Sequence, residues 1–182
     1  MTVPRVLCAV AYLVLIASVT ASALAIYSNG HGLLFYFMWI HLAIILLGWS
    51  GIASIIKHKL YRADRARDFV ARSKALLAVS VLIIGVAAFA ARSVDIGLGR
   101  MADGTVIHQK GWFERDGKYW MTINDRAPVE ISRTQYRRLD GAMFAFFSLI
   151  WVIMSCVLAY GWAYIAWSES ERLTAAGNAH TR

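Results

Sequence analysis

Charge is missing from four long stretches of this 182-residue chain. All 19 Lys and Arg residues and all 11 Asp and Glu residues fall outside these stretches, and so does every Asn and Gln. Proton relays, ion sites and substrate pathways in membranes nearly always require such groups inside the helix bundle. Their absence therefore argues against an ion-coupled transporter or pump.

The four uncharged stretches are apolar runs of membrane-spanning length. The chain is 59% apolar and 16% charged, whereas a soluble domain is usually about 45–50% apolar and about 25% charged. A helix needs about 20 apolar residues to cross the hydrocarbon core. The runs cover residues 6–27, 33–56, 75–91 and 141–167. They predict an all-α membrane protein with four transmembrane helices.

The first run also has features of a secretory signal. MTVPR is a basic start, and Ala23-Leu24-Ala25 offers the small residues of a cleavage site. However, the run has 22 residues, more than the roughly 7–15 of the apolar region of a signal peptide. We therefore expect an uncleaved helix.

Basic residues are concentrated in the connection 57–74. It carries seven Lys and Arg in 18 residues, whereas residues 92–140 carry nine in 49, together with seven acidic residues. Because cytoplasmic loops carry an excess of Lys and Arg, we expect the 57–74 loop and both termini in the cytoplasm of a bacterial cell. Residues 92–140 then lie on the outer face of the inner membrane.

Anionic lipid accounts for the net charge of +8 without a nucleic-acid partner, because basic segments beside a membrane are attracted to its head groups. The residues expected to face these lipids are Lys57, Lys59, Arg62, Arg65 and Arg67.

Three regions follow from this pattern. Residues 1–91 hold the first three transmembrane helices and the basic loop, residues 92–140 form an extracytoplasmic cap, and residues 141–182 hold the last helix and a cytoplasmic tail. The two cysteines, Cys8 and Cys156, both lie in apolar runs, so no disulfide can form within the cap.

Small residues mark one side of the first run. Ala17, Ala21 and Ala25 recur every four residues, with Ser18 and Ser22 beside them. Such a stripe allows two membrane helices to approach closely. We expect it to pack within the four-helix bundle, and the alternative is a seam between two copies of the chain.

The cap is predicted to contain a β-hairpin. Residues 104–114 and 118–124 flank Asp116-Gly117, and Asp-Gly between such segments is a strong hairpin signal. A two-residue turn there pairs Glu114 with Tyr119, Phe113 with Trp120 and Trp112 with Met121. A third strand is expected at residues 129–132.

The last helix is expected to begin near Ser132, because Ser132-Arg133-Thr134-Gln135 has the spacing of a capping box. The helix would then start before its apolar run and carry the cap at its base.

No motif in the chain indicates a metal site or catalysis. HExxH, CxxC, EF-hand and G-x-S-x-G patterns do not occur. Asp103, His108, Glu114 and Asp116 could act as acid and base on a lipid head group, but only their proximity in sequence favours this. The sequence leans against an enzyme, and we assign no metal ligand and no catalytic residue.

His41 is the one imidazole within an apolar run. The favoured interpretation is a neutral histidine that is hydrogen-bonded inside the bundle. The alternative is a ligand of haem b or a quinone. A haem between helices usually takes a second histidine at similar depth, and only His41 of another copy could supply it.

Tyrosine and tryptophan gather near the ends of the apolar runs, where such residues commonly anchor a protein at the membrane–water interface. We expect this role for Tyr27, Tyr36, Trp39, Tyr160, Trp162, Tyr164 and Trp167.

The predicted hairpin carries aromatic residues on both faces. One interpretation is structural, with one face packed on the base of the last helix and the other among head groups. The compatible alternative is recognition of a protein partner, because Trp, Tyr and Arg dominate interface hot spots. The residues expected to bind that partner are Trp112, Phe113, Arg115, Tyr119 and Trp120.

The function expected from these features is a non-enzymatic interaction protein of a bacterial inner membrane. It would be an accessory subunit of a membrane complex or an immunity protein against a membrane-acting toxin, with lipids and one protein as partners and no cofactor. The alternatives are a haem- or quinone-binding redox subunit that uses His41, and, third, a channel formed by self-assembly into a homo-oligomer.

Overall fold

Four long apolar helices dominate the computed structural model, which is mostly helical. They are α1 (Val3–Ser28), α2 (Leu34–Lys57), α4 (Lys74–Ser93) and α5 (Arg133–Ala179). Each contains a segment long and apolar enough to cross a membrane, so the prediction of four long apolar helices is confirmed. The structure describes residues 2–28, 34–57, 60, 63–93, 99–100, 106–107, 110–124 and 126–179.

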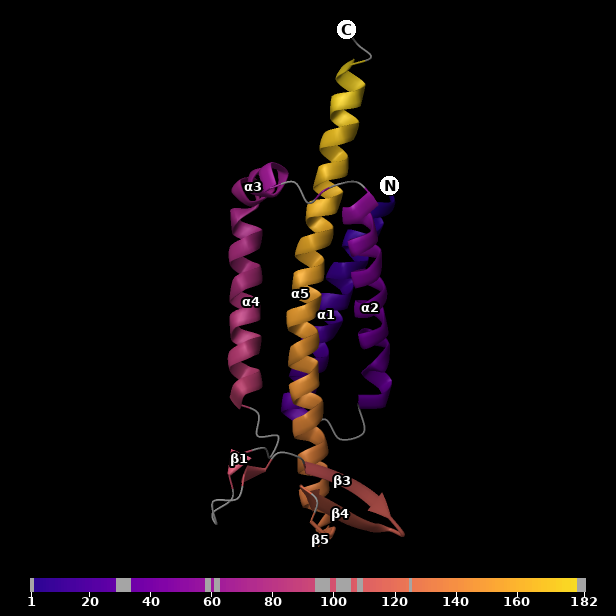
Figure 1. The fold of residues 1–182 in the computed structure, drawn as a ribbon, viewed down its shortest axis with the longest axis vertical. Helices are drawn as coiled ribbons and strands as arrows, with labels where there is room; N and C mark the ends of the chain where they lie inside the picture. The colour runs from indigo at the N-terminus through magenta and orange to yellow at the C-terminus, as the bar shows by residue number, and fades with distance from the viewer. Residues whose placement is uncertain are drawn as a thin grey trace.

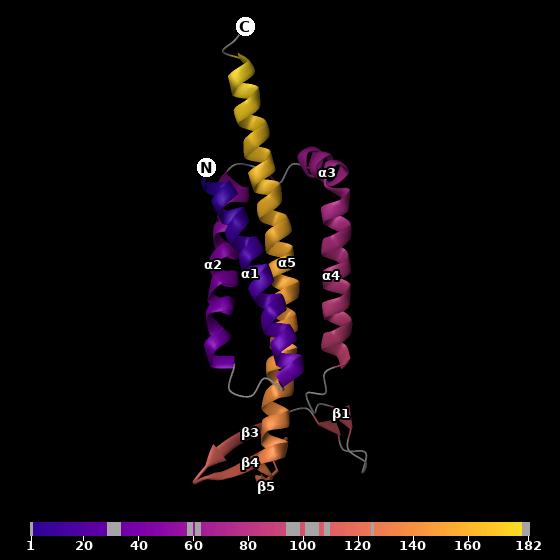
Figure 2. The same ribbon diagram turned by 180° about the vertical axis from the view of Figure 1, so that it is seen from behind.

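Helix α5 is the centre of the bundle. It contacts α1, α2 and α4 along its length, with α1 and α2 on one side and α4 on the other (Figures 1 and 2). It also extends past the bundle at both ends, so one continuous helix links the sheets at one end to the C-terminus at the other. The sequence pattern assigned no helix or strand to the tail after residue 167. In the structure, this tail continues α5 to Ala179.

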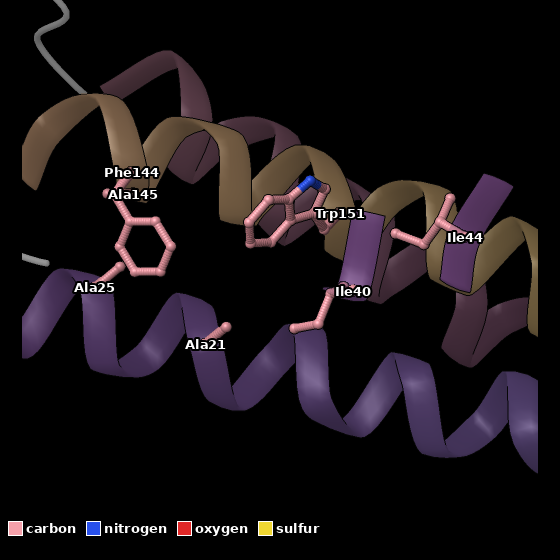
Figure 3. Close-up of a cluster of buried hydrophobic side chains, with 7 residues drawn as sticks. All are labelled: Ala21, Ala25, Ile40, Ile44, Phe144, Ala145 and Trp151. Atoms are coloured by element: carbon pink, nitrogen blue, oxygen red, sulfur yellow. The ribbon is translucent and has the colours of Figure 1, made fainter. Parts of the chain in front are cut away.

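Small residues explain how closely α1 approaches α5. Ala21 and Ala25 are fully buried against Phe144 and Trp151 of α5, and Figure 3 shows the two alanines facing the larger side chains. Ile40 and Ile44 of α2 complete this cluster. The small-residue stripe therefore packs within the chain, as expected, and is not available as a seam between copies.

Buried hydrogen bonds join the helices inside the bundle. The hydroxyl groups of Ser18 on α1 and Ser155 on α5 lie 2.9 Å apart. The indole Nε1–H of Trp162 donates to the carbonyl oxygen of Leu47 on α2 at 3.2 Å. This indole lies against Gly51, where a Cβ would be in ordinary van der Waals contact with Trp162 Nε1 at 3.6 Å. Trp162 is thus a core residue, and its prediction as an interfacial anchor was wrong.

A short helix that the sequence did not predict occupies the basic connection. Helix α3 (Ala63–Arg72) lies crosswise at the end of α4, at the same end of the bundle as the N-terminus (Figures 1 and 2). We call this the α3 end. The opposite end, which carries the strands, is called the sheet end.

The sheet end holds two small antiparallel sheets. Strands β3 (Lys110–Arg115), β4 (Lys118–Ile123) and β5 (Val129–Ile131) form the larger one, in the order β3-β4-β5. Strand β1 (Gly99–Arg100) pairs with β2 (Val106–Ile107) in a separate sheet, which the sequence did not predict. The strand predicted over residues 104–114 is therefore divided between two sheets.

The turn and register of the β3–β4 hairpin are those predicted. Asp116 and Gly117 have φ angles of 54° and 72°, the left-handed conformation that a two-residue hairpin turn requires at both positions. Phe113 pairs with Trp120, with Glu114–Tyr119 and Trp112–Met121 on either side. The capping box also forms. The backbone N–H of Gln135 donates to Ser132 Oγ at 3.2 Å, and the backbone N–H of Ser132 donates to Gln135 Oε1 at 2.9 Å.

Candidate functional site

The three-stranded sheet has two faces with different surroundings. Because side chains alternate along a strand, the register places Trp112, Tyr119 and Met121 on one face and Phe113 and Trp120 on the other. The predicted partner-binding residues are therefore divided between opposite faces of one hairpin.

The first face packs on α5. The Tyr119 ring lies 4.8 Å from the ring of Tyr136, in the first turns of α5, and β3 and β4 both contact this helix. Trp112 is half-buried on the same face. The expected contact between one aromatic face and the base of the last helix is confirmed.

The second face carries a groove, which we call the outer groove. Its volume is about 310 Å³, and it is lined by Phe113, Arg115, Asp116, Lys118, Trp120 and Pro128. Phe113 is 38% exposed. Three of the five predicted partner-binding residues, Phe113, Arg115 and Trp120, thus come together in one depression.

The charged side chains around the outer groove form exposed ion pairs. Arg115 Nε lies 3.6 Å from Asp116 Oδ2, and Lys118 Nζ lies 3.1 Å from Glu130 Oε2. All four side chains are more than half exposed, and ion pairs at such sites contribute roughly 0–1 kcal/mol. These ion pairs therefore contribute little to the stability of the hairpin.

Lys118 and Pro128 belong to the groove but were not predicted as partner-binding residues. Lys118 follows the turn residues directly and pairs with Arg115 across the strands, so the hairpin register could have identified it. Pro128 precedes β5, and its place in the groove depends on how that strand folds back beside β4. No sequence signal gives this.

The described part of the sheet brings no acid and base together. Glu114 and Asp116 are both exposed, and Asp116 faces Arg115. Asp103 and His108, the other two acid–base candidates, lie outside the described residues. No group of three His, Cys, Asp or Glu side chains that could hold a metal ion occurs within the described ranges.

His41 is exposed on the outside of α2. The favoured prediction, a histidine hydrogen-bonded inside the bundle, was wrong about its direction. Its neighbours Leu42 and Ile45 are also exposed. The imidazole therefore points away from the bundle, toward its surroundings. The other four histidines lie outside the described residues.

At the α3 end, aromatic residues enclose one another. Phe69 of α3 is buried, with ring centroids 5.3 Å from Tyr160, 5.2 Å from Tyr164 and 5.5 Å from Trp167. We call these four residues the α3 aromatic cluster. The last three were predicted as interfacial anchors, and the structure shows that they hold α3 on α5.

Hydrogen bonds reinforce the α3 aromatic cluster. The Tyr164 hydroxyl donates to the carbonyl oxygen of Leu60 at 2.6 Å, and the hydroxyls of Tyr160 and Ser73 lie 3.2 Å apart. Of the predicted lipid-facing residues, Lys57 and Arg67 are exposed and Arg65 is half-buried. Lys59 and Arg62 lie outside the described residues.

Comparisons of the chain with protein-family models, with curated proteins and with solved structures found no match.

Proposed function

We propose that this chain is a non-enzymatic interaction protein of a bacterial inner membrane that recognises a protein partner through the outer groove. It acts as an accessory subunit of a membrane complex or as an immunity protein that intercepts a membrane-acting toxin. The observation that carries the proposal is the groove itself, in which Phe113, Trp120 and Arg115 are presented together on the sheet face opposite Tyr119.

The two faces of the sheet support this assignment when they are considered together. Docking on Tyr136 already fixes the hairpin in place through the Tyr119 face, so Phe113 is not needed to hold the sheet on α5. Large aromatic residues and arginine in a depression are typical of interface hot spots. The groove is therefore suited to an apolar anchor residue from another protein.

The charge of the groove indicates the chemistry of the partner. Its lining has two basic side chains, Arg115 and Lys118, and one acidic side chain, Asp116. A segment with an apolar side chain flanked by a carboxylate matches this arrangement, because complementary charge steers association and fixes orientation.

The charge distribution supports an orientation with the α3 end in the cytoplasm. The 57–74 connection carries seven Lys and Arg and lies at the α3 end with the N-terminus, and cytoplasmic loops are enriched in these residues. In this orientation the outer groove faces the periplasm, where a toxin arriving from outside would meet it first.

Co-purification in mild detergent from native membranes tests the proposal. We expect a stoichiometric partner with the wild-type chain and its loss with Phe113→Ala/Trp120→Ala. Trp112→Ala is the matched control, because it removes a half-buried ring from the opposite face of the same hairpin. Equal recovery of the partner with Phe113→Ala/Trp120→Ala and with Trp112→Ala would contradict recognition by the groove.

The two forms of the proposal differ in when the partner is present. An accessory subunit has its partner in resting membranes. An immunity protein acquires one only when toxin-producing cells are added, and the groove variant then fails to protect its host.

A redox role is a second candidate, favoured by the outward direction of His41. Two copies packed through α2 could place their exposed imidazoles toward one another, which a single chain cannot do. A reduced-minus-oxidised visible spectrum of the purified protein tests the haem form of this idea. A haem band that is lost in His41→Ala would support it, and a spectrum without such a band would remove it.

A further inference from the structure

A second pocket lies at the α3 end, far along α5 from the outer groove. Its volume is about 250 Å³, and α3 and α5 both line it. We call it the α3–α5 pocket. Its lining residues are Arg65, Asp68, Arg72, Trp167, Ser168, Glu171, Arg172 and Ala175.

The pocket is built on helices whose positions are fixed. Phe69 is buried in the α3 aromatic cluster, and Arg72 Nη1 lies 3.1 Å from Glu171 Oε1. The Arg72 guanidinium also lies over the Trp167 ring, 5.8 Å from its centroid. Because Arg65 and Arg72 are seven residues apart on a helix, they lie on the same side of α3.

The charges of the lining favour an anion. Three guanidinium groups face two carboxylates, so the pocket has a formal charge of +1. Planar guanidinium groups bind phosphate with two parallel hydrogen bonds. One carboxylate, Glu171, is already paired with Arg72.

A buried hydroxyl in the same lining gives a second, independent indication. Ser168 is 2% exposed, and its Oγ has no hydrogen-bond partner among the residues that the structure describes. A buried polar group without a partner is costly, and it is expected to find one in a ligand, a water or an ion. A ligand with several acceptor oxygens could accept from both this hydroxyl and the guanidinium groups.

The pocket also lies where phosphate groups are abundant. Ser168 directly follows the apolar run 141–167, and α3 lies crosswise at this end of the bundle. In a chain that crosses a membrane, the end of an apolar run marks the level of the lipid head groups.

We infer that the α3–α5 pocket binds a phosphate group, carried either by the head group of an anionic lipid or by a soluble phosphate. Arg65 binds its oxygens, Arg72 and Arg172 contribute positive charge, and Ser168 donates a hydrogen bond. The site is independent of the outer groove, since it lies at the other end of α5 and shares no residue with it.

Titration of delipidated, detergent-solubilised protein tests the inference, with binding read by native mass spectrometry. The probes are phosphatidylglycerol, zwitterionic phosphatidylcholine, and inorganic phosphate at matched ionic strength. We expect one saturable site for phosphatidylglycerol or for inorganic phosphate. Saturation by the lipid alone identifies the head group as the source, and saturation by inorganic phosphate identifies a soluble one.

Two variants with the same change of charge separate a built site from general attraction. Arg65→Gln and Arg67→Gln each remove one positive charge from α3, but only Arg65 lines the pocket. We expect Arg65→Gln to weaken binding about tenfold, the effect of losing one hydrogen bond to a charged group, and Arg67→Gln to leave it near the wild-type value.

Two further variants distinguish a loss of binding from a loss of folding. Ser168→Ala should weaken binding by several-fold without lowering the thermal midpoint, because it removes a buried hydroxyl that has no partner in the described chain. Arg65→Lys keeps the charge and loses the planar fork, so its affinity should fall between wild type and Arg65→Gln. Equal losses in Arg65→Gln and Arg67→Gln, or no saturable binding of any probe, would overturn the inference.

Discussion

Aromatic side chains gather at both ends of α5, but a phenylalanine is buried among other rings only at the α3 end. At the α3 end, Phe69 is 6% exposed within its ring of three partners, whereas Phe113 at the sheet end is 38% exposed. The two ends use the same residue types. They differ in whether the phenylalanine is covered by other rings of the chain.

This difference separates a structural cluster from a candidate interface. The α3 aromatic cluster joins two segments that are about a hundred residues apart in the chain, and its packing is complete without another molecule. In the outer groove, Phe113 and Trp120 are paired across one hairpin, and no residue of a described helix lines the groove. We propose that a second protein covers this side.

Truncation of the two phenylalanines should give the largest contrast. Phe69→Ala should cost about 3 kcal/mol, because it empties a site enclosed by three rings. Phe113→Ala should cost less than about 1 kcal/mol. Hydrogen exchange of the amides in α3 and β3 measures both effects, and Val70→Ala, on the exposed side of α3, is the control. Similar losses of amide protection in the two phenylalanine variants would show that the two ends do not differ in aromatic packing.

Trp162→Phe should destabilise the core of the bundle. The change removes the hydrogen bond to the Leu47 carbonyl and leaves space beside Gly51, so we expect a loss of about 2 kcal/mol. Trp49→Phe is the control, since Trp49 is exposed on the same α2 that Trp162 contacts. Thermal unfolding in detergent should show a lower midpoint for Trp162→Phe only.

Ser132→Ala tests how firmly α5 begins at the sheet end. Loss of the capping hydroxyl, which accepts from the Gln135 amide, should cost about 1 kcal/mol. The effect should be local, with faster exchange of the amides in the first turn of α5 and none at the α3 end. Thr134→Ala, on the exposed side of the same turn, should leave these amides protected.

Exposed ion pairs should contribute least at either end. Lys118–Glu130 and Arg72–Glu171 are both more than half exposed, so Glu130→Gln and Glu171→Gln should each change the free energy of unfolding by less than about 1 kcal/mol. Chemical unfolding in detergent measures this. A much larger effect at one end only would mean that charge, rather than aromatic packing, distinguishes the two ends.

The sequence predicted features that depend on local pattern. The four apolar runs form four long helices, Asp116-Gly117 sets the hairpin register, and the Ser132 capping box marks the start of α5. In each case the residues that determine the structure lie within one segment, so their spacing carries the information.

Features that depend on contacts between distant segments were not predicted. Helix α3 was treated as a basic loop because only two of its residues, Phe69 and Val70, are large and apolar. Its stability comes from rings on α5 that the sequence analysis had assigned to the membrane interface. His41 faces outward for a similar reason, since the rotation of α2 is set by the packing of Ile40, Ile44 and Leu47 against its neighbours.

The division of the hairpin into two faces also required the structure. Alternation along the strands placed Phe113 and Trp120 together, but it could not say which face docks on α5. The contact between Tyr119 and Tyr136 decides this, and Tyr136 lies in another element.

Site-specific photocrosslinking in native membranes tests whether the outer groove binds a protein. A photoreactive residue would replace Phe113 or Trp120, with Val129 as the control on the other face of the sheet and Val70 as the control at the α3 end. We predict one discrete protein adduct from positions 113 and 120 and none from positions 129 and 70. Adducts with lipid alone at 113 and 120, or the same protein adduct from all four positions, would contradict the account.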